Sequence, residues 1–183
     1  MPEHVLAGQG YAALCADMSS WAVRQAAGVN LSMGATGVQQ GMDFFEDAAR
    51  VLNERGIMDP QRVVITGFSG SASDVAYTLY NSSLFQAAIV TTQSYIDPIN
   101  CYLAGILGGC RRSFQRMGYQ PPYDSPDGYY GDVSPAWNAA RIRTPLLMQL
   151  PEVEYPAMMQ LYTAMEDIGR AAEMHVFPDE YHL

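Results

Sequence analysis

The sequence predicts an α/β fold, in which a mostly parallel sheet is covered by helices on both faces. Three observations lead to this expectation. Short apolar runs alternate along the chain with longer stretches that have a helical pattern of apolar residues. The segments between them are short and contain glycine, proline or aspartate, which end helices and form turns. The 183 residues, 49% of them hydrophobic and 16% charged, are enough for one domain with a buried core.

Five short apolar runs are the expected strands. In chain order they are residues 11–16, 62–66, 87–91, 146–150 and 173–177. The run at residues 62–66 is rich in β-branched residues, which is typical of a central strand in a parallel sheet. In the first of these runs, we expect Cys15 to be a buried core thiol.

Helices are expected between these strands. The clearest one covers residues 38–55, where apolar side chains recur at helical spacing, and it ends before Gly56, a natural C-terminal cap. The other expected helices are residues 72–79, 100–118, 134–140 and 156–169. Residues 17–37 and 121–130 have loop compositions, and we expect the whole segment of about 94–130 to be a variable, cap-like part of the domain.

A turn rich in glycine and serine links the second expected strand to the helix that follows it. Gly67–Ser71 reads Gly-Phe-Ser-Gly-Ser, which is close to the nucleophile-elbow pattern G-x-S-x-G of the α/β-hydrolases. That elbow needs small residues two positions before and two after the serine. Ser71 departs from the usual second glycine but is still small. Since short glycine-serine strings also occur in ordinary loops, the prediction of Ser69 as nucleophile and of the Gly70 N–H as oxyanion donor needs further support.

A serine hydroxyl becomes an effective nucleophile when an imidazole accepts its proton and a carboxylate orients that imidazole. The chain has three histidines. His4 is close to the N-terminus and His175 is inside an expected strand, whereas His182 follows the last strand. In open parallel sheets, catalytic groups gather at the carboxyl ends of the strands. The sequence therefore predicts His182 as the base that acts on Ser69.

The orienting acid has two candidates. Glu152 and Glu154 both follow the expected strand at 146–150, so that the order serine, acid, histidine found in α/β-hydrolases is kept. Two residues apart in an extended segment, their side chains would point the same way, and the pattern does not decide between them. We favour Glu154 and expect at least one of the two to be an ordinary solvated loop residue.

Charge and composition exclude several other classes of function. Acidic residues outnumber basic ones by 19 to 10, and the basic residues are all arginines without a dense cluster, so nucleic acid is not an expected partner. No apolar stretch is long enough to cross a membrane and no signal peptide is visible, which predicts a cytoplasmic protein. No metal-ligand spacing, phosphate-binding loop or dinucleotide fingerprint is present, so neither a metal nor a cofactor is expected.

Three stretches resemble the catalytic domain of the prolyl oligopeptidase family of serine peptidases: residues 55–63, 134–147 and 161–182. Most of that family has His-Gly and then Asp after the strand that ends here at Leu150. Residues 148–155 of this chain differ from that pattern. Together with the ending of the chain, they are more similar to the lasso peptide isopeptidases, a branch of the family that hydrolyses the isopeptide bond closing the ring of a threaded lasso peptide.

The resemblance implies an α/β-hydrolase fold, a peptide substrate such as a lasso peptide, and Ser69, Glu154 and His182 as the catalytic triad. Family members also carry an N-terminal β-propeller, an upstream tyrosine that serves as a second oxyanion donor, and a closing C-terminal helix. Because none of these matches a segment here, we expect residues 1–183 to be a partial catalytic domain, truncated at both ends and weakly active or inactive. Two alternatives remain open: a general prolyl oligopeptidase-type peptidase or esterase, and a degenerate, non-catalytic binding module.

Overall fold

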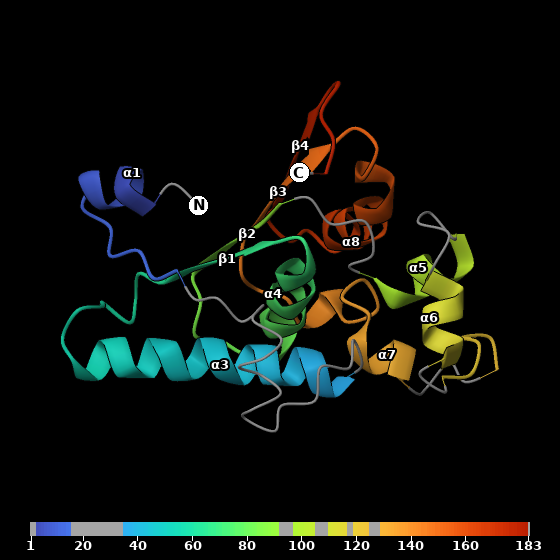
Figure 1. The fold of residues 1–183 in the computed structure, drawn as a ribbon, viewed down its shortest axis with the longest axis horizontal. Helices are drawn as coiled ribbons and strands as arrows, with labels where there is room; N and C mark the ends of the chain where they lie inside the picture. Colours follow the sequence, from blue (N-terminus) through green and yellow to red (C-terminus); the bar gives the residue numbers. More distant parts are fainter. Residues whose placement is uncertain are drawn as a thin grey trace.

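The computed structural model describes residues 3–15, 35–91, 97–104, 110–116, 119–124 and 129–182. A sheet lies at the centre of these residues, and helices follow its strands along the chain (Figure 1). The strands are β1 (Val64–Phe68), β2 (Ala87–Thr91), β3 (Leu146–Pro151) and β4 (Ala172–Phe177). The helices are α1 (Glu3–Gly8), α3 (Ala35–Glu54), α4 (Gly70–Asn81), α5 (Pro98–Ala104), α6 (Cys110–Arg116), α7 (Tyr129–Val133), the 3-10 helix η1 (Ala139–Arg141) and α8 (Tyr155–Asp167). The predicted alternation of strands and helices is confirmed.

The strands of this sheet are parallel and lie in the order β1-β2-β3-β4. One row of paired residues across the sheet consists of Ile65, Ala88, Leu146 and Ala172. Parallel neighbours need a crossover connection, which α4 provides between β1 and β2 and α8 provides between β3 and β4. Because all four strands point the same way, the residues that follow them gather at one edge of the sheet.

The main core lies between one face of the sheet and the helices α4 and α8. Val75 and Leu79 of α4 and Leu161 of α8 are buried together with the side chains of the strands, such as Met148. Burying side chains of this kind stabilises a fold by about 1.5–3 kcal/mol each. Helix α3 lies alongside α4, on the side away from the sheet (Figure 1). The core therefore fixes α4 directly behind the turn that carries Ser69.

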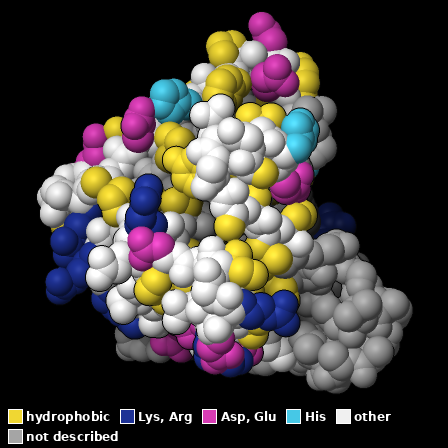
Figure 2. All heavy atoms as spheres, turned by 90° about the vertical axis from the view of Figure 1, so that its left-hand side faces the viewer, with side chains coloured by type: hydrophobic (Ala, Val, Ile, Leu, Met, Phe, Trp, Pro, Cys, Tyr) yellow, Lys and Arg dark blue, Asp and Glu magenta, His cyan; other side chains and the backbone are white. Residues whose placement is uncertain are grey.

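The other face of the sheet is more open in the described residues. Val64 and Phe68 of β1 are 49% and 45% exposed, and Phe177 of β4 is 44% exposed. In β4, Glu173 and His175 also point to solvent. Hydrophobic side chains gather in a band on the side of the molecule drawn in Figure 2. Helix coverage of the two faces is thus uneven, with α4 and α8 on the buried one.

The expectation of a first strand at residues 11–16 is wrong. Residues 11–15 have no regular secondary structure, and residue 16 lies outside the described residues. Tyr11 and Leu14 are 60% and 55% exposed, and Cys15 is exposed instead of buried. An apolar run becomes a strand only when a neighbouring strand accepts its backbone hydrogen bonds. Here the run pairs with none of the four described strands, so its apolar character does not produce a strand.

Between β2 and β3 the structure differs from the expected single helix at residues 100–118. Two shorter helices, α5 and α6, occupy parts of this range, and residues 105–109 and 117–118 lie outside the described residues. Tyr129 and Tyr130, expected in a loop, begin α7. Tyr102, Phe114 and Tyr130 form a separate aromatic cluster that holds this part together.

Candidate active site

The residues singled out in the sequence meet at the carboxyl-end edge of the sheet. Ser69 directly follows β1, Glu154 lies three residues after β3, and His182 lies five residues after β4. The parallel direction of the strands brings these three segments to the same edge, although up to 113 positions separate them in the chain. The fold therefore supplies the proximity, and the turns after the strands set the orientation of each side chain.

Ser69 occupies a strained backbone conformation between β1 and α4. Its φ of 54° and ψ of −126° lie outside the regions that non-glycine residues prefer. Such a conformation costs about 1–3 kcal/mol and persists only where the surrounding structure imposes it. Ser69 occupies the N-cap position of α4, yet its hydroxyl makes no capping hydrogen bond. The hydroxyl is instead directed to the edge of the sheet.

Gly67 explains why the turn needs a residue without a side chain. A Cβ atom at this position would lie 2.6 Å from the carbonyl oxygen of Ser71 and 2.8 Å from the Cα of Ala72. Both are backbone atoms of α4, so the strand and the helix pass too close for any larger residue. This close passage is the steric requirement from which the elbow was predicted.

Ser71 makes a second contact within the elbow. Its hydroxyl donates to the carbonyl oxygen of Phe68 over 2.8 Å and accepts from the N–H of Phe68 over 2.9 Å. The residue that departs from the usual glycine pattern therefore ties down the residue just before Ser69. The elbow pattern predicts only that residue 71 is small, and it gives no sign of this contact.

A chain of two hydrogen bonds joins the three predicted side chains. The Oγ of Ser69 is 2.9 Å from the Nε2 of His182, and the Nδ1 of His182 is 2.7 Å from the Oε1 of Glu154. With Nδ1–H donating to the carboxylate, Nε2 is the acceptor for the serine proton. The imidazole is partly exposed and lies beside the ring of Phe68, with ring centroids 5.9 Å apart. This arrangement can move a proton from a hydroxyl to an imidazole.

The structure distinguishes the two glutamates that the sequence left open. Residues 152–154 form a turn, so their side chains do not point the same way, as an extended segment would require. Glu152 is exposed, whereas Glu154 is only 4% exposed and contacts His182. Glu154 also occupies the N-cap position of α8, where the helix dipole favours a negative charge. Its backbone N–H donates to the carbonyl oxygen of Pro151 over 2.9 Å, which fixes the turn.

Gly70 begins α4, so its N–H belongs to the first turn, where no helix carbonyl accepts it. A Cβ on Gly70 would meet nothing within 4 Å, so there is open space beside this residue. The position suits a donor to a negatively charged oxygen that develops next to Ser69.

The remaining two histidines lie outside this arrangement. His175 is in β4, where its Nε2 is 2.6 Å from the Oε1 of Glu173, and both side chains are more than half exposed. His4 lies in α1, a helix without buried residues. Of the three histidines, His182 is the one whose ring lies within hydrogen-bond distance of Ser69.

Asp97 is a buried carboxylate that the sequence analysis did not single out. It is 1% exposed, and it accepts hydrogen bonds from the N–H groups of Ile99 and Asn100 and from the hydroxyl of Ser134. Burial raises its pKa, against the opposing effect of these hydrogen bonds. The Asp97-Pro98 pair was the available signal, since aspartate commonly caps a helix that has proline in its first turn. Asp97 fastens α5 to the segment before η1.

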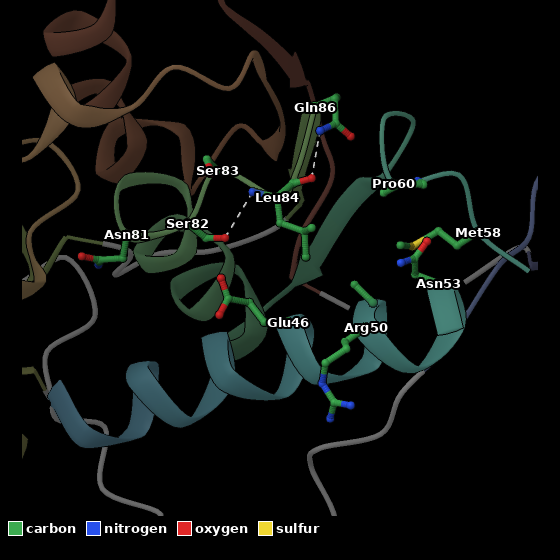
Figure 3. Close-up of a pocket in the computed structure, with 11 residues that line it drawn as sticks. Glu46, Arg50, Asn53, Met58, Pro60, Asn81, Ser82, Ser83, Leu84 and Gln86 are labelled. Atoms are coloured by element: carbon green, nitrogen blue, oxygen red, sulfur yellow. Dashed lines mark hydrogen bonds between the residues drawn. The ribbon is translucent and has the colours of Figure 1, made fainter. Parts of the chain in front are cut away.

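The larger cavity lies away from these residues. Its volume is about 620 Å³, and it is lined by α3 together with the segments that lead into β1 and β2 (Figure 3). Glu46 and Arg50 of α3 and Asn81 at the end of α4 are among its lining residues. Since the segments before the strands lie at the opposite edge of the sheet from Ser69, this cavity is not part of the site.

A smaller cavity of about 150 Å³ is lined mostly by apolar side chains from α5, α7 and the loops beside them. In the described residues no group of three or more histidine, cysteine, aspartate or glutamate side chains could hold a metal ion. No helix in the same residues combines the length and apolar character needed to cross a bilayer.

Nearly the whole chain matches a known protein family. Residues 4–183 match the prolyl oligopeptidase family. The chain belongs to the prolyl oligopeptidase family. Members of this family are serine peptidases, and the resemblance stated from the sequence is confirmed.

The lasso peptide isopeptidase AtxE2 of Asticcacaulis excentricus is a relative with 34% identity over 140 residues, which are 75% of this chain and 20% of AtxE2. The chain thus spans about a fifth of the length of this relative. A solved structure of an AtxE2 isopeptidase variant with Astexin3-dC4 bound has 29% identity and a TM-score of 0.64 over 77% of this chain and 21% of that one.

An acylaminoacyl peptidase of Pyrococcus horikoshii shares the fold, with a TM-score of 0.69 and 21% identity over 87% of this chain and 26% of that one. The expected fold class, an α/β-hydrolase fold with a mostly parallel sheet, is therefore confirmed.

Proposed function

We propose that the protein is a serine hydrolase that cleaves an amide bond through an acyl-enzyme, with Ser69 as nucleophile, His182 as general base and Glu154 as the orienting acid. The observation that carries the proposal is the pair of hydrogen bonds from Ser69 through His182 to Glu154, 2.9 and 2.7 Å long. The family membership supports it, since the family consists of serine peptidases.

In the first step the Oγ of Ser69 attacks the carbonyl carbon of the substrate, and its proton passes to the Nε2 of His182. The carboxylate of Glu154 holds the proton on Nδ1 and stabilises the positive charge that forms on the ring. The carbonyl oxygen becomes an oxyanion, and the N–H of Gly70 is placed at the start of α4 to donate to it.

In the second step the tetrahedral intermediate collapses. The bond between the carbonyl carbon and the leaving nitrogen breaks, and that nitrogen takes the proton from His182. A water molecule then attacks the acyl group on Ser69, with His182 again accepting a proton, which releases the carboxylic acid and restores the hydroxyl. Apart from the substrate and water, the reaction needs no further group.

We propose the isopeptide bond of a lasso peptide as the substrate bond. This rests on the similarity to AtxE2, which is named a lasso peptide isopeptidase, and on the similarity to the AtxE2 structure with Astexin3-dC4 bound. An isopeptide bond is an amide, so the acyl-transfer steps apply to it unchanged. Substrate choice would then depend on the surfaces around the site rather than on the triad.

Three substrates separate the proposal from its alternatives. The polypeptide that carries these residues is incubated with a lasso peptide, with a linear peptide and with a p-nitrophenyl ester, and the products are followed by mass and by absorbance. Ring opening of the lasso peptide, recorded as a gain of one water, is the expected result, and Ser69→Ala abolishes it. Cleavage of linear peptides or esters alone would favour a general peptidase or an esterase. No turnover of any of the three by the folded protein would favour a binding module.

A further inference from the structure

Phe68, the residue before Ser69, ends β1, and Ser71 in the first turn of α4 contacts its backbone. Within the described residues, β1 is the edge strand, with β2 on one side only. The N–H of Ser69 donates to the carbonyl oxygen of Thr91 in β2 over 3.1 Å. Backbone groups of successive residues in a strand point to opposite sides. The N–H and the carbonyl of Phe68 therefore point away from β2, to the open edge.

Ser71 takes both of these groups with one hydroxyl. Its oxygen accepts from the N–H of Phe68 over 2.9 Å, and its proton is donated to the carbonyl oxygen of Phe68 over 2.8 Å. This single side chain replaces the two backbone partners that a further strand would supply. It holds the peptide groups on both sides of Phe68, and the second of these leads directly into the backbone of Ser69.

Two groups of the proposed mechanism depend on Phe68. Ser69 follows it at a φ of 54°, a conformation that the surrounding structure must impose. The ring of Phe68 lies beside the imidazole of His182, with centroids 5.9 Å apart. A shift of Phe68 would therefore move the nucleophile and the base relative to each other, and misplacement by about 1 Å can cost roughly a hundredfold in rate.

We propose that Ser71 is a positioning residue for the reaction. Its hydroxyl fixes Phe68, and through Phe68 it sets the Oγ of Ser69 against His182. The inference rests on the proposed function and adds to it a role for a residue that the G-x-S-x-G pattern treats only as small. In the elbow pattern glycine is the usual residue at this position, and glycine has no hydroxyl to offer.

The test compares three substitutions at this position with a matched control. Ser71→Ala and Ser71→Gly remove the hydroxyl, and Ser71→Thr keeps it. Ser82→Ala removes a serine hydroxyl at the other end of α4, where it accepts from the N–H of Leu84 over 3.3 Å. For each variant, kcat and KM are measured on a p-nitrophenyl ester in the whole polypeptide, together with the rate of labelling by a fluorophosphonate and the melting temperature.

We expect kcat to fall about fivefold to a hundredfold in Ser71→Ala and Ser71→Gly, which corresponds to the loss of two hydrogen bonds. KM should change less than about twofold, because the Ser71 hydroxyl is engaged with the backbone of Phe68, and the labelling rate should fall with kcat. Ser71→Thr should recover most of the lost rate. Ser82→Ala should keep the rates of the unmodified protein.

Unchanged kcat in the folded Ser71→Ala and Ser71→Gly variants would overturn the positioning role, as would a Ser71→Thr variant that loses as much as Ser71→Ala. A melting temperature that falls while kcat stays constant would assign Ser71 to stability alone and would also overturn the inference. If alanine prevents folding, the glycine and threonine variants still make the comparison. Failure of the unmodified protein to turn over the ester or to be labelled would instead refute the proposed function, and with it the role of Ser71.

Discussion

The strongest consequence of the site geometry concerns the two glutamates that follow β3. Replacing Glu154 by glutamine removes a negative charge 2.7 Å from the Nδ1 of His182, in a side chain that is 5% exposed. Replacing Glu152 by glutamine makes the same chemical change on an exposed side chain two residues away. The two variants therefore differ in one respect: only Glu154→Gln changes a side chain that contacts the imidazole of His182.

The size of the effect follows from the charge that forms on His182 during the reaction. At 2.7 Å and an effective dielectric constant of about 20, two unit charges attract by roughly 6 kcal/mol. The imidazole is 41% exposed, so solvent screens part of this attraction, and we expect about 3–5 kcal/mol to be lost from the transition state. This is roughly a 10²–10⁴-fold decrease of kcat for Glu154→Gln. For Glu152→Gln we expect less than about a twofold change.

The assay is the steady-state hydrolysis of a p-nitrophenyl ester by both variants, with circular dichroism as the check that each is folded. Glutamine keeps the shape of glutamate, so the KM of Glu154→Gln should stay close to that of the unmodified protein. Equal activity of the two variants would refute the assignment of the acid, and a large loss in Glu152→Gln alone would reverse it.

Two further predictions concern stability. Gly67→Ala forces a Cβ to within 2.6 Å of the α4 backbone, so we expect the free energy of unfolding, measured by urea titration, to fall by about 1–3 kcal/mol. Gly70→Ala is the control, because a Cβ there has nothing within 4 Å and should not destabilise the protein. Equal stability of the two variants would contradict the close passage of strand and helix. The pKa of Asp97 is raised in the folded state, so folding favours its protonated form. The stability that Asp97 contributes is therefore present below its ordinary pKa, and it declines as the pH rises through the pKa of the folded state. Unfolding measured from about pH 3.5 upward should therefore show the free-energy difference between the unmodified protein and Asp97→Asn shrinking with rising pH, and a constant difference would contradict the burial effect.

The meeting of Ser69, Glu154 and His182 at one edge of the sheet could be predicted from the sequence because the signals there are local. Small residues around Ser69 report the tight passage between strand and helix, and the positions of Glu154 and His182 after strands report their common edge. The choice between Glu152 and Glu154 needed the structure. It depends on a turn at 152–154 that rotates one side chain inward, whereas the pattern suggested an extended segment.

Other features depend on partners that a sequence pattern does not reveal. The run at residues 11–15 has the composition of a strand, but it pairs with none of the described strands and its side chains are exposed. The proposed role of Ser71 depends on the edge position of β1 among the described strands, because the hydroxyl contacts backbone groups that another strand would otherwise take. In both cases the tertiary neighbours, and not the local sequence, decide the outcome.

The most direct test of the proposed chemistry is to identify the atom that reacts. The folded polypeptide is treated with a fluorophosphonate, digested, and analysed by mass spectrometry of the peptides. A single adduct on Ser69 is expected, absent from Ser69→Ala and formed at least about a hundredfold more slowly in His182→Ala, since the hydroxyl would then have no base 2.9 Å away. An unlabelled Ser69 in a folded protein, or labelling that proceeds equally fast without His182, would contradict the account.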